Sequence, residues 1–124
     1  MSNTKWRKFF NIANSRSLEI NACVWKLTDT EEPVQGFLPE VDELGKDYVG
    51  DCGALNGPFP FSLIEWLFIP STHSYREYEK APLKYIKQDV YKIAEQLEAL
   101  GQFELEFLGD GIKVYGYKVY GYKV

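Results

Sequence analysis

The hydrophobic positions near the start of the chain repeat first with the period of a helix and then with the period of a strand. Residues 4–14 (TKWRKFFNIAN) place apolar side chains three or four positions apart, which predicts a short helix. Residues 18–27 alternate instead, which predicts a strand near the middle of a sheet. The helical stripe is Trp6, Phe9, Phe10 and Ala13; the strand has a wholly apolar face, Leu18, Ile20, Ala22 and Val24, and a half-apolar face, Asn21, Cys23, Trp25 and Leu27.

The second half of the chain contains a buried strand and the longest helical pattern. Residues 61–70 (FSLIEWLFIP) hold an apolar run that is interrupted only by Glu65 and closed by Pro70, which predicts a buried strand. Apolar residues then recur every three or four positions, which predicts a helix that starts at Pro82 and ends at Gly101. A coiled-coil seam is the alternative, but strands flank the pattern, so packing on the sheet is favoured. The stripe is Leu83, Ile86, Val90, Ile93, Leu97 and Leu100.

The residues after this helix predict a β-hairpin. Two alternating runs in FELEFLGDGIKVYGY, residues 103–117, are joined through a Gly-Asp-Gly turn. If Gly109 and Asp110 form a two-residue loop, both faces of the hairpin become consistent. The predicted cross-strand pairs are then Phe107 with Ile112, Leu105 with Val114, and Glu106 with Lys113.

The chain ends with a doubled pentapeptide, VYGYK, at 114–118 and 119–123. Because strand side chains alternate, a repeat of five turns the second copy over, unless a bulge at Gly116 or Gly121 resets the phase. We interpret residues 119–124 as a terminal duplication. The alternative is an extra strand that pairs with the sheet edge of another molecule and forms a homo-oligomer.

Together these patterns predict an α+β fold in a single domain, residues 1–124. We expect a mostly antiparallel sheet, a short N-terminal helix, one long helix in the C-terminal half and a C-terminal β-hairpin. Short strands are expected around VQGFL and DYVGD, inside a loop-rich segment at 29–58. Tryptophan, tyrosine and phenylalanine supply 3, 9 and 8 residues, enough for a core without a disulfide or metal.

The first residues and the short apolar runs of the chain favour a cytoplasmic protein. The first residues lack the apolar stretch of a signal peptide, and the apolar runs are too short to span a membrane. Cys23 and Cys52 are therefore expected to be free thiols.

Negative charge is concentrated in one stretch of the sequence. The chain carries a net charge of −4, yet residues 29–51 hold eight acidic side chains against one lysine, a net charge of −7. The preceding 28 residues are basic, with a net charge of +4. This asymmetry disfavours nucleic acid as a partner and favours a basic protein.

The acidic segment, residues 29–51, is the candidate binding surface. Interfaces combine aromatic or apolar anchors with a charged rim that steers the partner. This pattern predicts an immunity or antitoxin-like inhibitor of a basic protein such as a nuclease. The alternative is that the apolar residues only fasten the loop to the core. The expected steering charges are Glu31, Glu32, Asp42, Glu43 and Asp47, and the expected anchors are Phe37 and Tyr48.

Patterns typical of catalysis are sparse. A small hydrolase or thiol enzyme using Cys52, His73 and an acid such as Asp51 is the alternative function. Nearby carboxylates would raise the pKa of the thiol, which disfavours this function. Glycine patterns for phosphate binding and residue spacings for zinc or calcium are missing from the sequence. We therefore expect no catalytic residues, no metal and no cofactor.

Three stretches resemble a small bacterial family of unknown function. They are NTKWRKFF at 3–10, FPFSLIEWLFIP at 59–70 and LGQFELEFLGDGIKVYGY at 100–117. The resemblance implies a bacterial origin and a stand-alone domain, and it carries over no catalytic residues. The doubled tail departs from the family pattern, which ends after one VYGY-like strand.

Overall fold

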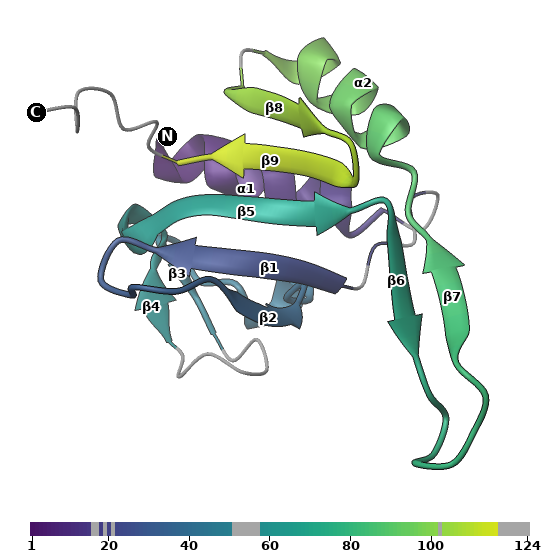
Figure 1. The fold of residues 1–124 in the computed structure, drawn as a ribbon. Coiled ribbons are helices and arrows are strands. Elements are labelled where there is room, and N and C mark those ends of the chain that lie inside the picture. Colours follow the sequence, from purple (N-terminus) through teal and green to yellow (C-terminus); the bar gives the residue numbers. More distant parts are fainter. Residues whose placement is uncertain (16–17, 19, 21, 51–57, 102, 117–124) are drawn as a thin grey trace, which may run out of the picture.

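The computed structural model describes residues 1–15, 18, 20, 22–50, 58–101 and 103–116, and gives only the backbone of residues 73 and 75. Two α-helices, two short 3-10 helices and nine strands follow one another along this part of the chain (Figure 1). They are α1 (Asn3–Ala13), β1 (Ala22–Leu27), β2 (Val34–Phe37), η1 (Val41–Glu43), β3 (Tyr48–Val49), β4 (Phe59–Pro60), η2 (Phe61–Leu63), β5 (Ile64–Pro70), β6 (Thr72–Tyr75), β7 (Lys84–Lys87), α2 (Val90–Leu100), β8 (Leu105–Leu108) and β9 (Gly111–Tyr115).

The main sheet has five antiparallel strands in the order β2-β1-β5-β9-β8. The central strand, β5, is the apolar run predicted to be buried, and its Ile64, Leu67 and Ile69 are fully enclosed. Helix α1 lies behind the sheet, and α2 lies toward its β8 edge (Figure 1). The α+β fold with a mostly antiparallel sheet, a short N-terminal helix and a C-terminal hairpin is therefore confirmed.

Helix α1 forms where the sequence pattern predicts it. The Ser2 side chain accepts a hydrogen bond from the backbone N–H of Lys5 and caps the first turn. At the other end, the Asn14 side chain donates to the backbone oxygens of Phe10 and Pro39, at 2.7 and 3.0 Å. The predicted stripe is the buried face: Trp6, Phe9, Phe10 and Ala13.

The C-terminal hairpin has the predicted register. Leu105 pairs with Val114, Glu106 with Lys113, and Phe107 with Ile112. Gly111 also lies where β9 meets β5, and a Cβ atom there would lie 2.3 Å from the Ile69 carbonyl oxygen. A glycine at this position therefore allows the close approach of the strands.

Strand β1 is shorter than its predicted range, and its half-apolar set faces the core. Cys23, Trp25 and Leu27 are buried, whereas Ala22 and Val24 are only half-buried on the opposite face. Leu18 and Ile20 are buried before the strand begins, so they do not mark its inner face. The large Trp25 ring decides the orientation because it packs against aromatic rings of α1 and β4.

The predicted start of the long helix at Pro82 is wrong, since α2 begins at Val90. The Asp89 side chain caps it by accepting from the backbone N–H of Lys92 at 3.0 Å. Leu83 precedes β7 and Ile86 lies within it, so two members of the predicted stripe belong to a hairpin. Val90, Ile93 and Leu97 pack in the core as predicted, and Gly101 caps the helix. Leu100, the last member of the predicted stripe, is exposed instead.

No helix in the described ranges is both long and apolar enough to cross a membrane.

Asp89→Ala is expected to lower the free energy of unfolding by about 1 kcal/mol, because the N-cap hydrogen bond is lost. Asp89→Ser is the matched control and should retain most of the stability, since serine also caps helices. Urea denaturation followed by circular dichroism measures both. A helix that began at Pro82 would place Asp89 in its interior, where alanine stabilises, so a gain in stability would contradict the observed start.

Candidate functional site

The acidic segment is distributed over a turn, a 3-10 helix and a short strand. Glu31 and Glu32 lie in the turn between β1 and β2, and Asp42 and Glu43 lie on η1. Asp47 directly precedes β3. All five carboxylate side chains are exposed.

Backbone hydrogen bonds give the second half of this segment a defined shape. The N–H groups of Gly45 and Gly50 donate to the oxygens of Tyr48 and Glu43, both at 2.9 Å. The N–H of Phe61 donates to the Asp47 oxygen, also at 2.9 Å. The Tyr48 ring lies against Gly45 so closely that a Cβ atom there would be 1.9 Å from it. The loop therefore holds Tyr48 and its acidic neighbours in a fixed arrangement.

The apolar residues of the segment divide between the core and the surface. Leu38 and Val49 are buried and fasten the loop to the body. Phe37, Val41 and Tyr48 stay exposed, at 64%, 50% and 44%. The two interpretations of the sequence therefore apply to different residues, and both predicted anchors, Phe37 and Tyr48, belong to the exposed group.

The five exposed carboxylates have no ion-pair partner among the described residues. The ion pairs in that part of the chain join Lys26 to Glu65 and Lys84 to Glu77. Arg7 is directed at the segment, but its guanidinium donates to the Lys46 backbone oxygen at 2.7 Å. The negative charge of the segment is therefore not neutralised by these pairs.

Four of the five carboxylates form two groups rather than one cluster. Glu31 and Glu32 lie before the start of β2, and Asp42 and Glu43 follow its end. Strand β2, which spans about 10 Å from Val34 to Phe37, lies between these two groups along the chain. It is also an edge strand of the sheet, paired only with β1 among the described strands. The candidate site is thus an edge strand with negative charge beyond each end.

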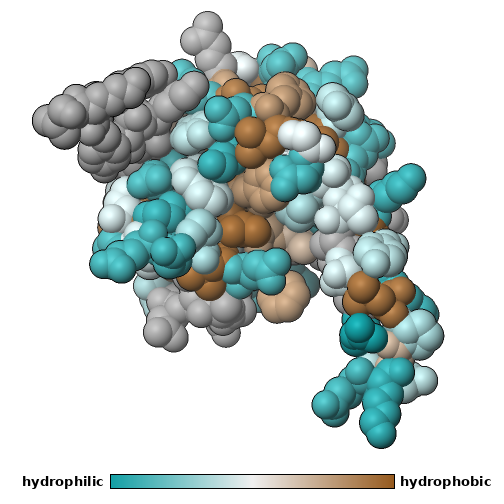
Figure 2. Space-filling view, in the orientation of Figure 1, coloured by the Kyte–Doolittle hydropathy of each residue, from teal (hydrophilic) through white to brown (hydrophobic). Residues whose placement is uncertain are grey.

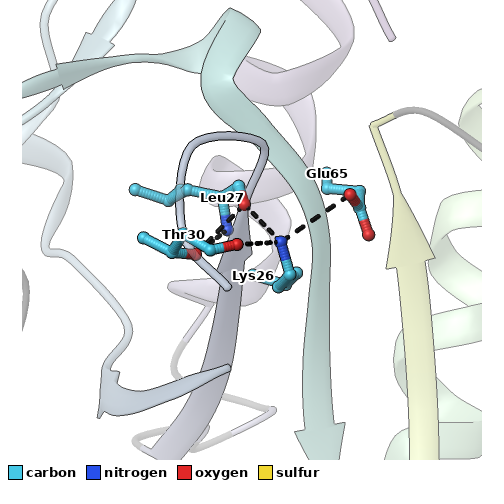
Figure 3. Close-up of polar contacts among 4 residues, drawn as sticks. All are labelled: Lys26, Leu27, Thr30 and Glu65. Atoms are coloured by element: carbon cyan, nitrogen blue, oxygen red, sulfur yellow. Dashed lines mark hydrogen bonds and ion pairs between the residues drawn. The ribbon is translucent and has the colours of Figure 1, made fainter. Parts of the chain in front are cut away.

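Lys26 holds the turn that presents Glu31 and Glu32 (Figure 3). Its ammonium donates to the backbone oxygens of Leu27 and Thr30, at 2.6 and 2.5 Å, and lies 3.8 Å from a Glu65 oxygen. The Thr30 hydroxyl closes the same turn by donating to the Leu27 oxygen at 3.1 Å. The Lys26 ammonium therefore binds the backbone of the turn and Glu65, and it does not form an ion pair with Glu31 or Glu32.

Lys26→Met is expected to lower the free energy of unfolding by about 2 kcal/mol, because two charge-assisted hydrogen bonds to carbonyl groups are lost. Glu65→Gln should cost less than about 1 kcal/mol, since its ion pair is long and partly exposed. Urea denaturation of both variants measures the difference, with Lys8→Met at an exposed position as the control. Equal losses of unfolding free energy in the two variants would show that Lys26 stabilises the protein through its ion pair with Glu65 and not through the turn.

The open face of the main sheet is a second surface, which the sequence patterns did not predict. Val24, Trp66 and Phe68 lie on the face opposite the helices and are half-buried. Figure 2 shows apolar side chains gathered along the middle of this face. Lys113 covers part of it, with its ammonium 4.3 Å from the centre of the Trp66 ring. The alternation of Trp66 and Phe68 with the buried Leu67 and Ile69 is the signal that could have revealed it.

Tyr115 and Glu106 form a polar pair on the same face. The tyrosine hydroxyl donates to a Glu106 carboxylate oxygen at 2.9 Å. The pKa of Tyr115 is raised from 10.0 to about 12. Burial of the phenol is the largest cause, and the hydrogen bond to Glu106 is the next. Because the folded-state pKa is raised, the stabilisation from the neutral phenol is present below pH 10 and is lost as the pH rises toward 12.

Glu106→Gln is expected to lower the pKa of Tyr115 but leave it above 10.0, because burial, the larger cause, remains. Spectrophotometric titration of tyrosinate measures the shift. The chain has nine tyrosines, so the titration of Tyr115→Phe is subtracted to isolate Tyr115. A difference curve centred at 10.0 in the unsubstituted protein would contradict the raised pKa.

The residues of the alternative enzyme function lie largely outside the described residues. Asp51, Cys52 and the side chain of His73 are outside them. The terminal duplication, residues 119–124, is also outside them. Cys23 is described and lies buried in the core. Within the described residues, no group of three or more histidine, cysteine, aspartate or glutamate side chains is suited to hold a metal ion.

No family model matches this chain, and no match was found among the curated proteins or the solved structures. This result agrees with the resemblance to an uncharacterised family with no recognised domain. It adds no activity, ligand or partner.

Proposed function

We propose that this chain is a non-catalytic protein-binding domain that engages a basic partner through the acidic segment, as an immunity protein or antitoxin engages its target. The observation that carries the proposal is that five carboxylates of the acidic segment stand exposed without an ion-pair partner among the described residues, and that Phe37 and Tyr48 of the same segment are exposed too. Unpaired surface charge steers an oppositely charged partner, and exposed aromatic side chains supply contact area.

The fixed shape of the segment supports the same proposal. The backbone bonds of Gly45 and Gly50 hold one acidic group, and the Lys26 turn holds the other. A surface ordered before binding loses little conformational entropy when a partner docks. A cytoplasmic location and a bacterial origin fit such an inhibitor, and both stay predictions.

Charge reversal at Asp42→Lys and Glu43→Lys is expected to weaken binding of a basic partner by roughly tenfold or more at low ionic strength, because attraction becomes repulsion. Pull-down at low ionic strength recovers basic proteins, and calorimetric titration of the purified partner at increasing salt measures the affinity. Wild-type binding should fall steeply with salt.

The matched control is Glu95→Lys with Glu98→Lys, which makes the same charge change at exposed positions of α2. These substitutions should leave binding nearly unchanged. Equal weakening by the two pairs would mean that only the net charge matters. Unchanged binding after reversal at Asp42 and Glu43 would remove the acidic segment from the interface.

A further inference from the structure

The β6–β7 hairpin extends away from the body as an arm (Figure 1). Its strands pair with each other, from Thr72 with Lys87 to Tyr75 with Lys84, and with no other described strand. A two-stranded hairpin is marginally stable by itself in water. The arm therefore needs support at its root, or contact with another surface, to keep its shape.

The buried amide of Gln88 provides support at the root. Its Nε2 atom donates to the backbone oxygens of Ala22 and Pro70, at 3.2 and 2.7 Å, and its Oε1 atom accepts from the Ala22 N–H at 3.1 Å. The Gln88 N–H donates to the Ser71 oxygen at 2.8 Å and ties the two arm strands together. These bonds connect the arm to β1 and β5, so the body sets the direction in which the arm projects.

The tip of the arm is also ordered, yet its large side chains are uncovered. Arg76 donates to the Ala81 backbone oxygen at 2.6 Å, and Ala81 is buried beneath the turn. Tyr78, Leu83 and Tyr85 remain exposed, at 65%, 41% and 67%. Exposed aromatic side chains on an ordered projection are typical of a docking element.

The charge of the arm is opposite to that of the acidic segment. Residues 72–87 carry four basic and two acidic side chains, a net charge of +2 in a chain of net charge −4. Strand β7 has a lysine at each end, Lys84 and Lys87. Strand β2 is also four residues long and has carboxylates beyond each of its ends. The two strands are therefore complementary in length and in the placement of charge.

We propose that the arm of one copy of this chain docks along the β2 edge of a second copy. Strand β7 adds to the sheet beside β2, its basic side chains approach the two acidic groups, and Tyr85 lies near Phe37. The receiving surface is the acidic segment, so this inference rests on the proposed function. The arm and the β2 edge lie on the same side of the molecule (Figure 1), so a two-fold rotation lets both copies exchange arms.

Sedimentation velocity over a concentration series at low and high salt tests the wild-type chain. A dimer that forms with increasing concentration and weakens with salt is expected, since the contact is small and electrostatic. A monomer at every concentration in low salt would overturn the proposal.

A charge swap tests which surfaces meet. Lys80→Glu with Lys87→Glu reverses the charge of two exposed arm side chains that make no hydrogen bond or ion pair with the described residues, unlike Lys84, which pairs with Glu77. This arm variant, and separately the Glu31→Lys, Glu32→Lys variant at the acidic group that Lys87 approaches, should each raise the dissociation constant of the dimer by roughly tenfold or more. Circular dichroism verifies that each variant is folded, and Lys8→Glu on α1 is the control for a reversed charge elsewhere.

Mixing the two variants should restore dimerisation to within about threefold of wild type, because each arm then meets a surface of opposite charge. A dimer that is insensitive to both pairs of substitutions, or a mixture that stays monomeric, would overturn the proposal. A wild-type chain that is monomeric but still binds a basic partner through its acidic segment would overturn the dimer proposal and leave the proposed function intact. Reversal of the acidic segment could weaken binding of both the basic partner and the second copy while reversal of the arm charges weakens neither. That result would retain the proposed function and show that the arm is not part of the dimer contact.

Discussion

The packing of one aromatic cluster determines how the rest of the structure is arranged. Phe10 stacks with Trp6, Trp25 and Phe61, with ring centres 5.7, 6.0 and 5.8 Å away, and Trp25 meets Phe59 edge to face at 5.6 Å. These rings join α1 to β1, β4 and η2. The indole N–H of Trp25 is buried without a hydrogen-bond partner among the described residues, which costs about 1–3 kcal/mol. Burial of the large apolar surfaces of the rings offsets that cost.

The acidic segment takes its place from this cluster. Phe59 pairs with Val49 between β3 and β4, so the end of the segment is tied to the aromatic rings. Asn14, at the end of α1, donates to the Pro39 oxygen and ties its middle to the same helix. The residues between these attachment points are too polar to be buried, because an unpaired carboxylate in the core is strongly unfavourable. The fastened backbone thus leaves these charges on the outside.

The sequence predicts best what is decided locally. The register of the C-terminal hairpin follows from its turn and its alternation, and every predicted pair forms. The predicted start of the long helix is wrong because Leu83 and Ile86 happen to fit a helical stripe. The cap at Asp89 and the pairing of β7 with β6 exclude a helix at those positions. The inner face of β1 depends on where Trp25 finds partners distant in the sequence. Charge density along the chain predicted the candidate site, but not its division by β2 into two groups.

The connection between β5 and α2, which contains the arm, is longer than a link between two neighbouring elements requires. Connections of two to six residues are common between neighbouring elements, whereas residues 71–89 separate Pro70 from Val90. A connection that only links two elements does not need paired strands, an ordered tip or a buried amide at its root. Gln88 satisfies its own polar atoms and the backbone of Ala22 and Pro70, so its burial is favourable only while the arm leaves the body in this direction. The structure therefore fixes the orientation of an exposed hairpin. The exposed side chains of that hairpin add to the stability of the chain only when they are buried against a second surface, as in the proposed dimer.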